Sequence, residues 1–257
     1  MKFRRNSVIV GLPVKTRYAI RKVAGLSESE VTRLFRVFEP YYQDVSLDLF
    51  RQDLSEKTHV ALLYGRETPE SEEELFGFST ILCREIPEAG DGIFLFSGDT
   101  VVDKRFWGAK TLQAAISTFL LRAKLRHPHR PLYWMLISKG FKTFLMMRNN
   151  FPLSYPGSGV DDVVSTRLHS KMNAFYGWKF GPCFDPSSSL IRFPKSMGAV
   201  RGPIADPDSK ALKHPEVRYF VEKNPDYREG VELACIAEVR LRDLVRLMFK
   251  YRVGAKG

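Results

Sequence analysis

One stretch of the sequence combines residue types that suit the binding of a phosphate group. Residues 98–126, GDTVVDKRFWGAKTLQAAISTFLLRAKLR, have the pattern of an apolar strand, a turn with a single glycine, Gly108, and a long amphipathic helix. Where a strand leads directly into a helix, the first backbone N–H groups of the helix have no intrahelical partner, and the helix dipole makes that end positive. Such amides form an anion site, so the turn is predicted to hold a phosphate.

Carboxyl and imidazole side chains in the same part of the chain could move a proton. Asp99, near the end of the strand, and Asp103, just after it, are candidates for a general base. Either could instead cap the following helix or pair with Lys104 or Arg105, which are the commoner roles for aspartates in such a position. His169, in an expected helix, is a further candidate because histidine is the side chain most often used as a general acid or base, although a lone histidine is more often a packed or surface residue.

The charge of the chain favours an acidic partner. The 257 residues include 40 Lys and Arg against 29 Asp and Glu, a formal net charge of +11. This excess suits nucleic acid, anionic lipid, a phosphate-bearing cofactor or an acidic protein, and does not choose among them. The basic residues are spread along the chain and no nucleic-acid motif is present, so we do not expect nucleic acid as the partner.

The cysteines point to a reducing compartment. Cys83, Cys183 and Cys235 are odd in number, far apart and without a CxxC pair, which predicts neither a disulfide framework nor a metal site. We therefore expect a cytoplasmic protein. Cys235, in an apolar strand, is predicted to be a small buried residue rather than a nucleophile. No segment approaches the roughly 20 apolar residues needed to cross a bilayer, so no transmembrane segment is expected.

Hydrophobic periodicity predicts an alternation of strands and helices. Strands are expected at 17–23, 59–67, 74–86, 91–103, 132–137 and 231–239. Helices are expected after Ser27, at 47–54, over 112–126, before Pro152, from Asp161 toward Tyr176, and at 241–252. Ser27 and Glu30 form a capping box, and Ser97 with Gly98 predicts a bulge in the strand 91–103.

These elements predict an α/β fold with a mixed, mostly antiparallel central sheet and flanking helices. Residues 1–16 are expected to be an irregular N-terminal arm, and residues 17–180 the core. Residues 181–257 begin with a proline-rich stretch of little periodicity, predicted to be a long loop. This loop-rich C-terminal extension ends in a strand and a helix that are expected to complete the same domain.

The order of elements resembles the GNAT superfamily of acyltransferases, over roughly residues 17–151 plus the strand near Cys235. In that superfamily the turn after the fourth strand usually reads Gln or Arg, then Gly-x-Gly-x-Gly or Ala, and its amides hold the pyrophosphate of an acyl-CoA. Here VVDKRFWGAKTL keeps Gly108, whereas Trp107 replaces the Gln or Arg. Lys110 and Leu112 occupy the other two small-residue positions.

The resemblance implies an N-acyltransferase that moves an acyl group from a pantetheine thioester to an amine by direct attack. The acceptor would be an amine-bearing small molecule or protein, and Val101 and Val102 would pair with the pantetheine arm. The residues implied to contact the cofactor in the turn are Lys104, Arg105, Trp107, Gly108, Ala109, Lys110 and Thr111. Leu145 lies where the family has the tyrosine that protonates the thiolate, so Tyr176 is kept as the candidate acid.

Because the turn has only one glycine, two acyl donors are compatible with it. Lys104, Arg105 and Lys110 could add charge-assisted contacts to the phosphates of acyl-CoA. Alternatively, the donor is acyl-phosphopantetheine on an acidic acyl carrier protein, which the basic residues beyond the turn would attract. A non-catalytic basic module that binds nucleic acid or senses CoA on the same scaffold is the alternative function.

Four aromatic residues lie near the turn and the strand that follows the helix. Phe106, Trp107, Tyr133 and Trp134 could line a tunnel for a fatty acyl chain. Core packing explains them equally well.

Overall fold

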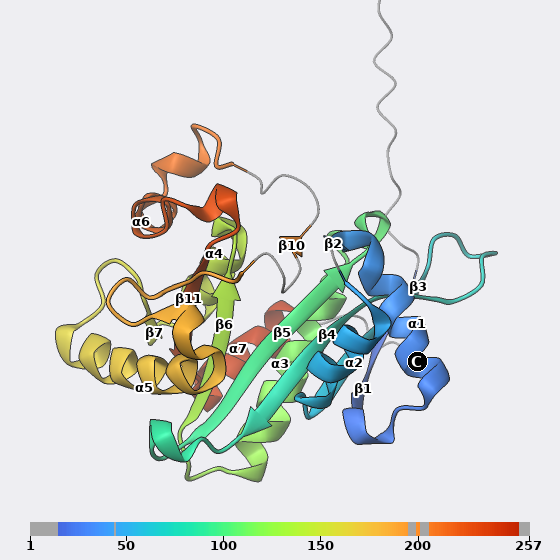
Figure 1. Ribbon diagram of the computed structural model, residues 1–257, viewed down its shortest axis with the longest axis horizontal. Helices are drawn as coiled ribbons and strands as arrows, with labels where there is room; N and C mark the ends of the chain where they lie inside the picture. The colour runs from blue at the N-terminus through green and yellow to red at the C-terminus, as the bar shows by residue number, and fades with distance from the viewer. Residues whose placement is uncertain (1–14, 44, 195–198, 201–205, 252–257) are drawn as a thin grey trace, which may run out of the picture.

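The computed structural model describes residues 15–43, 45–194, 199–200 and 206–251 (Figure 1). Most of the predicted N-terminal arm therefore lies outside the described residues. Lys15 and Thr16, which were assigned to the arm, belong to the first strand. Within the described ranges, no helix is both long enough and apolar enough to cross a membrane.

The strands form where apolar residues alternate or run continuously between turn residues. They are β1 Lys15–Lys22, β2 Tyr42–Gln43, β3 His59–Arg66, β4 Glu74–Arg84, β5 Ile93–Val102, β6 Leu132–Ser138, β7 Ser154–Tyr155, β8 Phe184–Asp185, β9 Leu190–Ile191, β10 Ala199–Val200 and β11 Glu232–Glu238. The six longest are the six strands that the sequence predicted, with shifts of a few residues at their ends.

The helices are α1 Glu28–Phe38, α2 Leu47–Ser55, α3 Thr111–Arg126, α4 Phe141–Asn150, α5 Asp162–Phe180, α6 Pro215–Lys223 and α7 Leu241–Lys250. Four of the seven helices in the described ranges, α1, α2, α5 and α6, follow a residue whose side chain caps the first turn. The predicted capping box is present at α1, where Ser27 accepts from the Glu30 amide and Glu30 accepts from the Ser27 amide. Ser46 caps α2 and Asp161 caps α5 in the same way, each through its side-chain oxygen.

The predicted fold class is confirmed, because one mixed sheet organises the described chain. Its strands lie in the order β1-β3-β4-β5-β6-β11-β9-β8, and β7 pairs with β11. Every pair is antiparallel except β5 with β6, which are joined by the crossover helix α3. A second, two-stranded sheet pairs β2 with β10.

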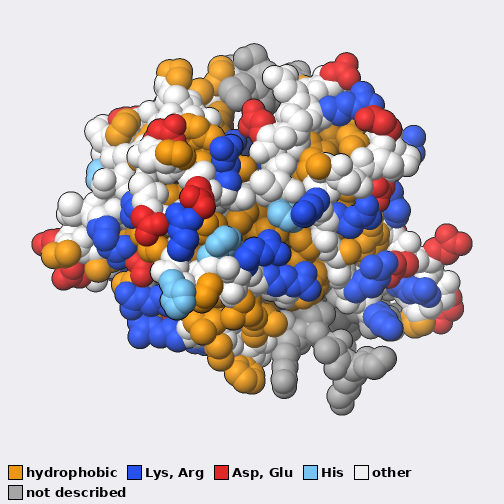
Figure 2. Space-filling view, turned by 90° about the horizontal axis from the view of Figure 1, so that it is seen from below, with side chains coloured by type: hydrophobic (Ala, Val, Ile, Leu, Met, Phe, Trp, Pro, Cys, Tyr) orange, Lys and Arg blue, Asp and Glu red, His pale blue; other side chains and the backbone are white. Residues whose placement is uncertain are grey.

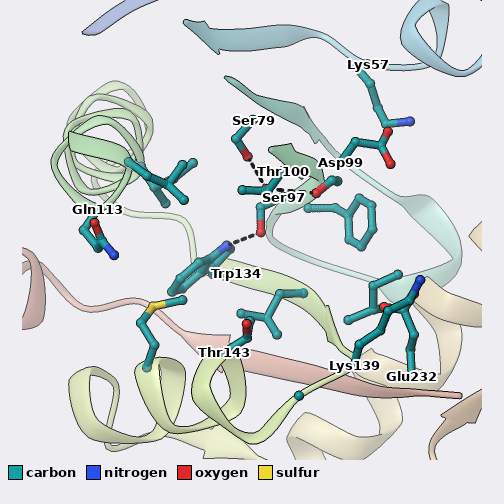
Figure 3. Close-up of a pocket in the computed structure, with 18 of the residues that line it drawn as sticks. Lys57, Ser79, Ser97, Asp99, Thr100, Gln113, Trp134, Lys139, Thr143 and Glu232 are labelled. Carbon is teal, nitrogen blue, oxygen red and sulfur yellow. Dashed lines mark hydrogen bonds and ion pairs between the residues drawn. The ribbon is translucent and has the colours of Figure 1, made fainter. Parts of the chain in front are cut away.

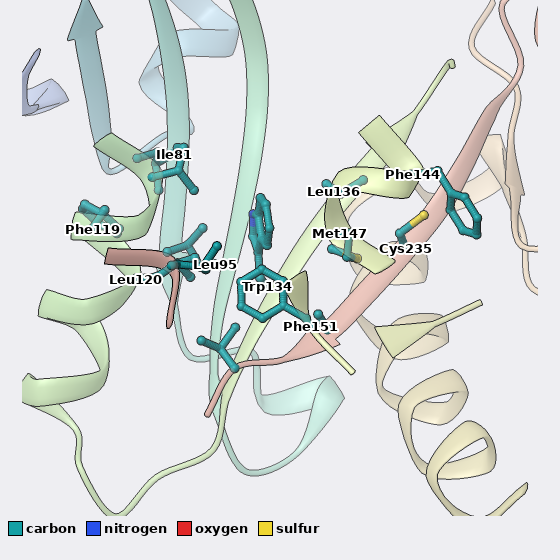
Figure 4. Packing of buried hydrophobic residues seen from close by; sticks show 14 of the residues in the cluster. Ile81, Leu95, Phe119, Leu120, Trp134, Leu136, Phe144, Met147, Phe151 and Cys235 are labelled. Carbon is teal, nitrogen blue, oxygen red and sulfur yellow. The ribbon is translucent and has the colours of Figure 1, made fainter. Parts of the chain in front are cut away.

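Helices cover both faces of the main sheet (Figure 1). In β3, Val60 and Leu62 pack with α1 and α2, whereas Ala61 and Leu63 pack with α3 on the opposite face. Helix α5 lies on the α1–α2 face, over Leu82 of β4 and the aromatic residues of β5. Helices α4, α6 and α7 share the α3 face (Figure 4), where Trp134 packs edge-on against Phe151. We call the two sides the α2 face and the α3 face.

The proline-rich stretch is more structured than the sequence predicted. Strands β8 and β9 pair with each other, and β9 adds to β11 at the edge of the main sheet. Helix α6 begins at Pro215, with the His214 side chain accepting a hydrogen bond from the Glu216 amide. Two-residue strands carry too little periodicity to be recognised, and proline at the first position of a helix was counted as a loop signal although it suits a helix start.

Candidate functional site

The candidate site is a cavity that opens where β5 and β6 separate. The two parallel strands pair from Ile93 with Leu132 to Phe96 with Met135, and beyond that point β6 continues to pair only with β11. The cavity has a volume of about 670 Å³, and its walls come from both faces of the sheet (Figure 3). It therefore passes through the sheet at the notch between β5 and β6.

A bulge in β5 decides which side chain faces which side of the notch. Ile81 of β4 lies opposite Ser97, but Ser79 lies opposite Thr100, so β5 has one extra residue here, as predicted. Before the bulge, Leu95 packs on the α3 face; after it, Val101 packs on the α2 face. The extra residue reverses the alternation and turns Asp99 toward α2.

Gly98 is required at the bulge because the backbone lies close to two side chains. A Cβ atom on Gly98 would lie 2.6 Å from Thr80 Oγ1 and 3.0 Å from Lys57 Cε. No larger residue fits without displacing one of them.

On the α2 side, Asp99 forms a carboxyl pair with Asp53 of α2. The two carboxyl groups lie within hydrogen-bond reach of each other, and they share a proton whenever Asp99 is protonated. Lys57 is buried beside them, and its Nζ lies 2.6 Å from Asp53 Oδ2 and 3.1 Å from the Asp53 carbonyl oxygen. Figure 3 shows Lys57 next to Asp99. This arrangement holds two acids and one cation together at the wall of the cavity, where the Lys57 side chain is buried and Asp53 stays partly exposed.

The pKa values of the two carboxyl groups are shifted in opposite directions. Burial raises the pKa of Asp99 to about 7, and the negative charge of Asp53 adds to the shift. Burial also opposes ionisation of Asp53, but Lys57, the hydrogen bond with Asp99 and Lys179 outweigh it and hold the pKa of Asp53 below its usual value. Near neutral pH, Asp53 is the ionised member and Asp99 exchanges a proton.

A second acid–base pair lines the cavity at the end of β6. Lys139 Nζ lies 3.2 Å from Glu232 Oε1, and burial raises the pKa of Glu232. Lys179 of α5 extends over the rings of Phe96 and Phe180, at 5.5 and 5.3 Å from their centroids. Together with the carboxyl pair, these groups make the α2 side of the cavity the charged side.

The α3 side of the cavity is mostly apolar. Trp134 donates through Nε1 to Ser97 Oγ at 3.1 Å, and Ser79 Oγ lies 2.8 Å from Thr100 Oγ1. Gln113 of α3 and Thr143 of α4 are the polar side chains nearest the opening (Figure 3). The cavity thus reaches the first turn of α3, which follows the turn predicted to bind phosphate.

That turn is partly closed on itself. The amides of Trp107 and Ala109 donate to the carbonyl oxygens of Lys104 and Phe106. Gly108 and Lys110 both have positive φ angles, of 97° and 52° respectively. No described side chain caps the start of α3. The first amides of α3 are thus the part of the turn that suits an anion, and Lys104 and Lys110 are exposed beside them.

Two residues of the predicted phosphate site have other partners. Arg105 forms ion pairs with Asp103, Glu67 and Glu74, at 2.8 to 2.9 Å. Thr111 is buried, and its Oγ1 bonds to Thr16 Oγ1 at 2.8 Å. Neither side chain is therefore placed to receive a phosphate.

The predicted strand partner of the pantetheine arm is also partly occupied. Val101 is buried in the α2-face core, and Val102 packs against the α3-face core. The exposed Trp107 turns its indole back and donates from Nε1 to the Val102 carbonyl oxygen at 2.9 Å. A pantetheine amide would have to displace this bond to pair with Val102, whereas the backbone from Ser97 to Thr100 lines the cavity.

Three candidate catalytic residues do not line the cavity. Asp103 takes the capping role, since it accepts from the Arg105 amide at 2.9 Å and ion-pairs with the same residue. His169 lies on α5 and contacts the Pro186 carbonyl and Asn173. Tyr176 is fully buried, with its hydroxyl 2.8 Å from the Leu136 carbonyl oxygen and 3.0 Å from that of Cys235. Tyr176 therefore links β6 to β11 through its hydroxyl group, away from the residues that line the cavity.

The aromatic residues proposed for a tunnel and the cysteine of the late strand can also be located in the structure. Of the four aromatic residues considered for a tunnel, Trp134 alone lines the cavity; Phe106 stacks on Phe76 in the core, and Tyr133 is buried on the other face. Cys235 is buried, as expected. Among the described residues, no cluster of His, Cys, Asp or Glu could hold a metal ion.

Asp53, Lys57, Lys139 and Glu232 are site residues that sequence reasoning missed. Asp53 and Lys57 have i,i+4 spacing, which on a helix surface is an ordinary ion pair. The available signal was position: both fall where α2 leads into β3, and Lys139 and Glu232 lie at the ends of two apolar strands. Only the sheet order shows that these ends meet at one notch.

No family model matches the sequence, and neither does any curated protein. Three of the solved structures similar to this chain are ElaA from Escherichia coli, a NatC complex bound to a Gag peptide and CoA, and Rv2747 from Mycobacterium tuberculosis in complex with CoA and NLQ. ElaA is 15% identical, with a TM-score of 0.34 over 52% of this chain and 86% of its own.

The other two cover more of this chain at similar scores. The NatC chain is 12% identical, with a TM-score of 0.36 over 87% of this chain and 99% of its own. Rv2747 is 11% identical, with a TM-score of 0.39 over 86% and 99%. At these scores the GNAT-like description of the fold rests on the strand order, the bulge and the notch.

Proposed function

We propose that the protein is an N-acyltransferase that moves an acyl group from a pantetheine thioester to an amine, without a covalent enzyme intermediate. The observation that carries the proposal is the carboxyl pair of Asp99 and Asp53, which lies in a notch that passes through the sheet. A base poised near neutral pH beside an opening between two strands is what deprotonation of a bound ammonium group requires.

The thioester would lie along the open edge of β5. Beyond Phe96 this edge is not paired with β6, so its backbone groups can bond to the pantetheine amides as a neighbouring strand would. Unpaired N–H groups at the bulge would also stabilise the negative charge that develops on the thioester carbonyl oxygen. The acceptor would enter from the α2 side, where the acidic groups lie.

In the proposed reaction the acyl group passes directly from the sulfur of the thioester to the nitrogen of the acceptor. Asp99, ionised, accepts a proton from the acceptor ammonium group and leaves a neutral amine. The amine nitrogen attacks the carbonyl carbon, and a C–N bond forms to give a tetrahedral intermediate whose nitrogen carries one proton too many for an amide. The C–S bond then breaks, and that proton passes through solvent to the departing thiolate, which leaves a neutral amide and a free thiol. Thr143, which lines the cavity on the α3 side, would relay this proton, and Asp99 returns its own proton to solvent before the next cycle. Asp53 keeps its charge throughout and holds the pKa of Asp99 high.

The donor is either acyl-CoA or acyl-phosphopantetheine on an acidic acyl carrier protein. The uncapped start of α3 with Lys104 and Lys110 supports a phosphate contact in either case. The face shown in Figure 2 has basic side chains in several groups among acidic ones, with no single basic tract of the kind that tracks nucleic acid. This distribution favours the acyltransferase over the nucleic-acid module.

The test uses the full chain with acetyl-CoA and octanoyl-CoA and a panel of primary amines. We expect thiol release that depends on the amine, an N-acyl product in the mass spectrum, and stabilisation of the fold by CoA thioesters. Failure of every thioester, on CoA or on pantetheine, both to stabilise the protein and to release thiol would overturn the proposal. Salt-sensitive binding to random duplex DNA with no thioester effect would support the alternative module.

A further inference from the structure

The cavity continues on the α3 side beyond the notch. Its inner part, which we call the inner arm, runs between α3, α4 and α7. It is lined by Ile116, Leu120, Trp134, Met146, Phe151 and Leu247. These six side chains are apolar, apart from the indole nitrogen of Trp134, which is bonded to Ser97. Ser117 of α3, Asn150 of α4 and Tyr251, just after α7, also line the cavity. The amide group of Asn150 is bonded to the Met146 carbonyl oxygen and to Lys250.

The inner arm is closed at its far end and open at its near end. Leu120, Phe151 and Leu247 are at most 3% exposed, although they line the cavity. Gln113 and Thr143, at the opening, are accessible to solvent. Leu120 lies two helical turns below Gln113, about 10 Å along the axis of α3. A ligand that enters beside Gln113 therefore has an apolar space ahead of it.

The position of the inner arm relative to the notch indicates what fills it. Trp134 is bonded to Ser97 at the bulge, so its ring lies at the end of the inner arm that is nearest the proposed thioester position. A group attached to the thioester carbonyl would pass this ring and meet mostly apolar walls. An acetyl group would leave the arm empty, whereas an alkyl chain would bury its methylene groups there.

We propose that the preferred donor carries an unbranched acyl chain of medium length, seated in the inner arm; this inference rests on the proposed acyltransferase function. The chain selects the donor through burial of methylene groups, and Leu120, Phe151 and Leu247 set its maximum length. Helix α7, which supplies Leu247, is thus part of the acyl-binding site.

The test measures binding and transfer along a chain-length series. S-alkyl-CoA thioethers with two, four, six, eight and ten carbons report binding without turnover, and the matching acyl-CoA thioesters report kcat/KM. Affinity should rise roughly fourfold per methylene group until the arm is full, and then fall. Tightest binding and fastest transfer with the two-carbon donor would overturn this inference but leave the proposed function standing. No binding at any length would overturn both.

Two substitutions examine the arm itself. Ser117→Leu on α3 fills the cavity wall and should remove the preference for long chains while two-carbon transfer is kept. The matched control is Thr118→Leu, on the same helix, whose side chain bonds to Tyr18 instead. Leu247→Ala deepens the arm and should move the optimum to longer chains. If the folded variants keep the wild-type chain-length profile, the arm is not the acyl site.

Discussion

Gly98 and Gly108 mark two bends at the end of β5, and the structure uses them differently. At Gly98 the backbone lies against Thr80 and Lys57, and the bend turns Asp99 into a cavity. At Gly108 a Cβ would meet nothing within 4 Å, and one of the basic side chains of this turn, Arg105, is paired with three carboxylates. The acid–base groups are thus concentrated at the bulge, and the turn offers the amides at the start of α3 with the exposed Lys104 and Lys110.

The two bends respond to different physical requirements. A bulge must place one side chain within hydrogen-bond reach of the reacting atoms, so its tolerance is small. A turn that contacts a phosphate works through charge and dipole, which act over longer distances and are screened by water. We therefore expect substitutions at the bulge to change the rate and substitutions at the turn to change donor affinity modestly.

The largest difference in kcat is expected between variants of Asp99, at the bulge, and Asp103, between the bulge and the turn. Asp99→Asn removes the base and should lower kcat by about 10²- to 10⁴-fold, with little change in binding of an S-alkyl-CoA. Asp103→Asn, which alters a cap and an exposed ion pair, should leave kcat within a few-fold of wild type. Steady-state kinetics on both variants check the difference; equal losses would show that Asp99 has no special role.

Substitution of the two glycines should give the next largest contrast. Gly98→Ala forces Lys57 or Thr80 to move and should lower kcat by roughly ten- to hundredfold through displacement of the carboxyl pair. Gly108→Ala strains a left-handed residue by about 1 kcal/mol, which thermal unfolding would detect, and should spare kcat. A reversed order of effects on kcat would place the reacting atoms near the turn.

The pH dependence of kcat/KM tests whether Asp99 is the general base. Because the pKa of Asp99 is about 7 and the ionised form is the base, kcat/KM should fall as the pH drops below about 7. Asp53→Asn removes the neighbouring charge and leaves Lys57 to pair with Asp99. The acidic limb should then move to lower pH by about one unit. A limb that stays in place would mean that another group titrates.

The smallest effect is expected at Arg105. Its guanidinium group is already paired with Asp103, Glu67 and Glu74, so Arg105→Gln should change the KM for acyl-CoA by no more than about threefold. Lys110→Gln is the matched comparison, because no described partner competes for Lys110, and it should raise the KM more. A larger effect of Arg105 would show that the carboxylates release it when the donor binds.

Much of the fold could be predicted from the sequence because local signals determine it. Each signal lies within a few consecutive residues. They are the spacing of the capping box at Ser27, the apolar runs of β3 to β6, and the glycine that interrupts β5 at Gly98. The short strands β8 and β9 could not be predicted, since they exist only through pairing with β11.

The site was predicted only in part for a related reason. Asp99 was accessible to reasoning because it shares the strand with the glycine that bends it. Asp53 comes from α2, Lys57 from the turn that follows it, and Glu232 from β11, so their approach depends on tertiary packing that no short pattern encodes. Tyr176 shows the converse: the sequence left it as the candidate acid, but in the fold its hydroxyl group is bonded to two backbone carbonyl oxygens.

The passage of the cavity through the sheet has a kinetic consequence. If donor and acceptor reach the notch from opposite faces, neither blocks the path of the other, and both must be present before the C–N bond can form. Initial-rate plots at several fixed acceptor concentrations should then give intersecting lines. Free thiol and amide would compete with different substrates, each on its own side of the β-sheet.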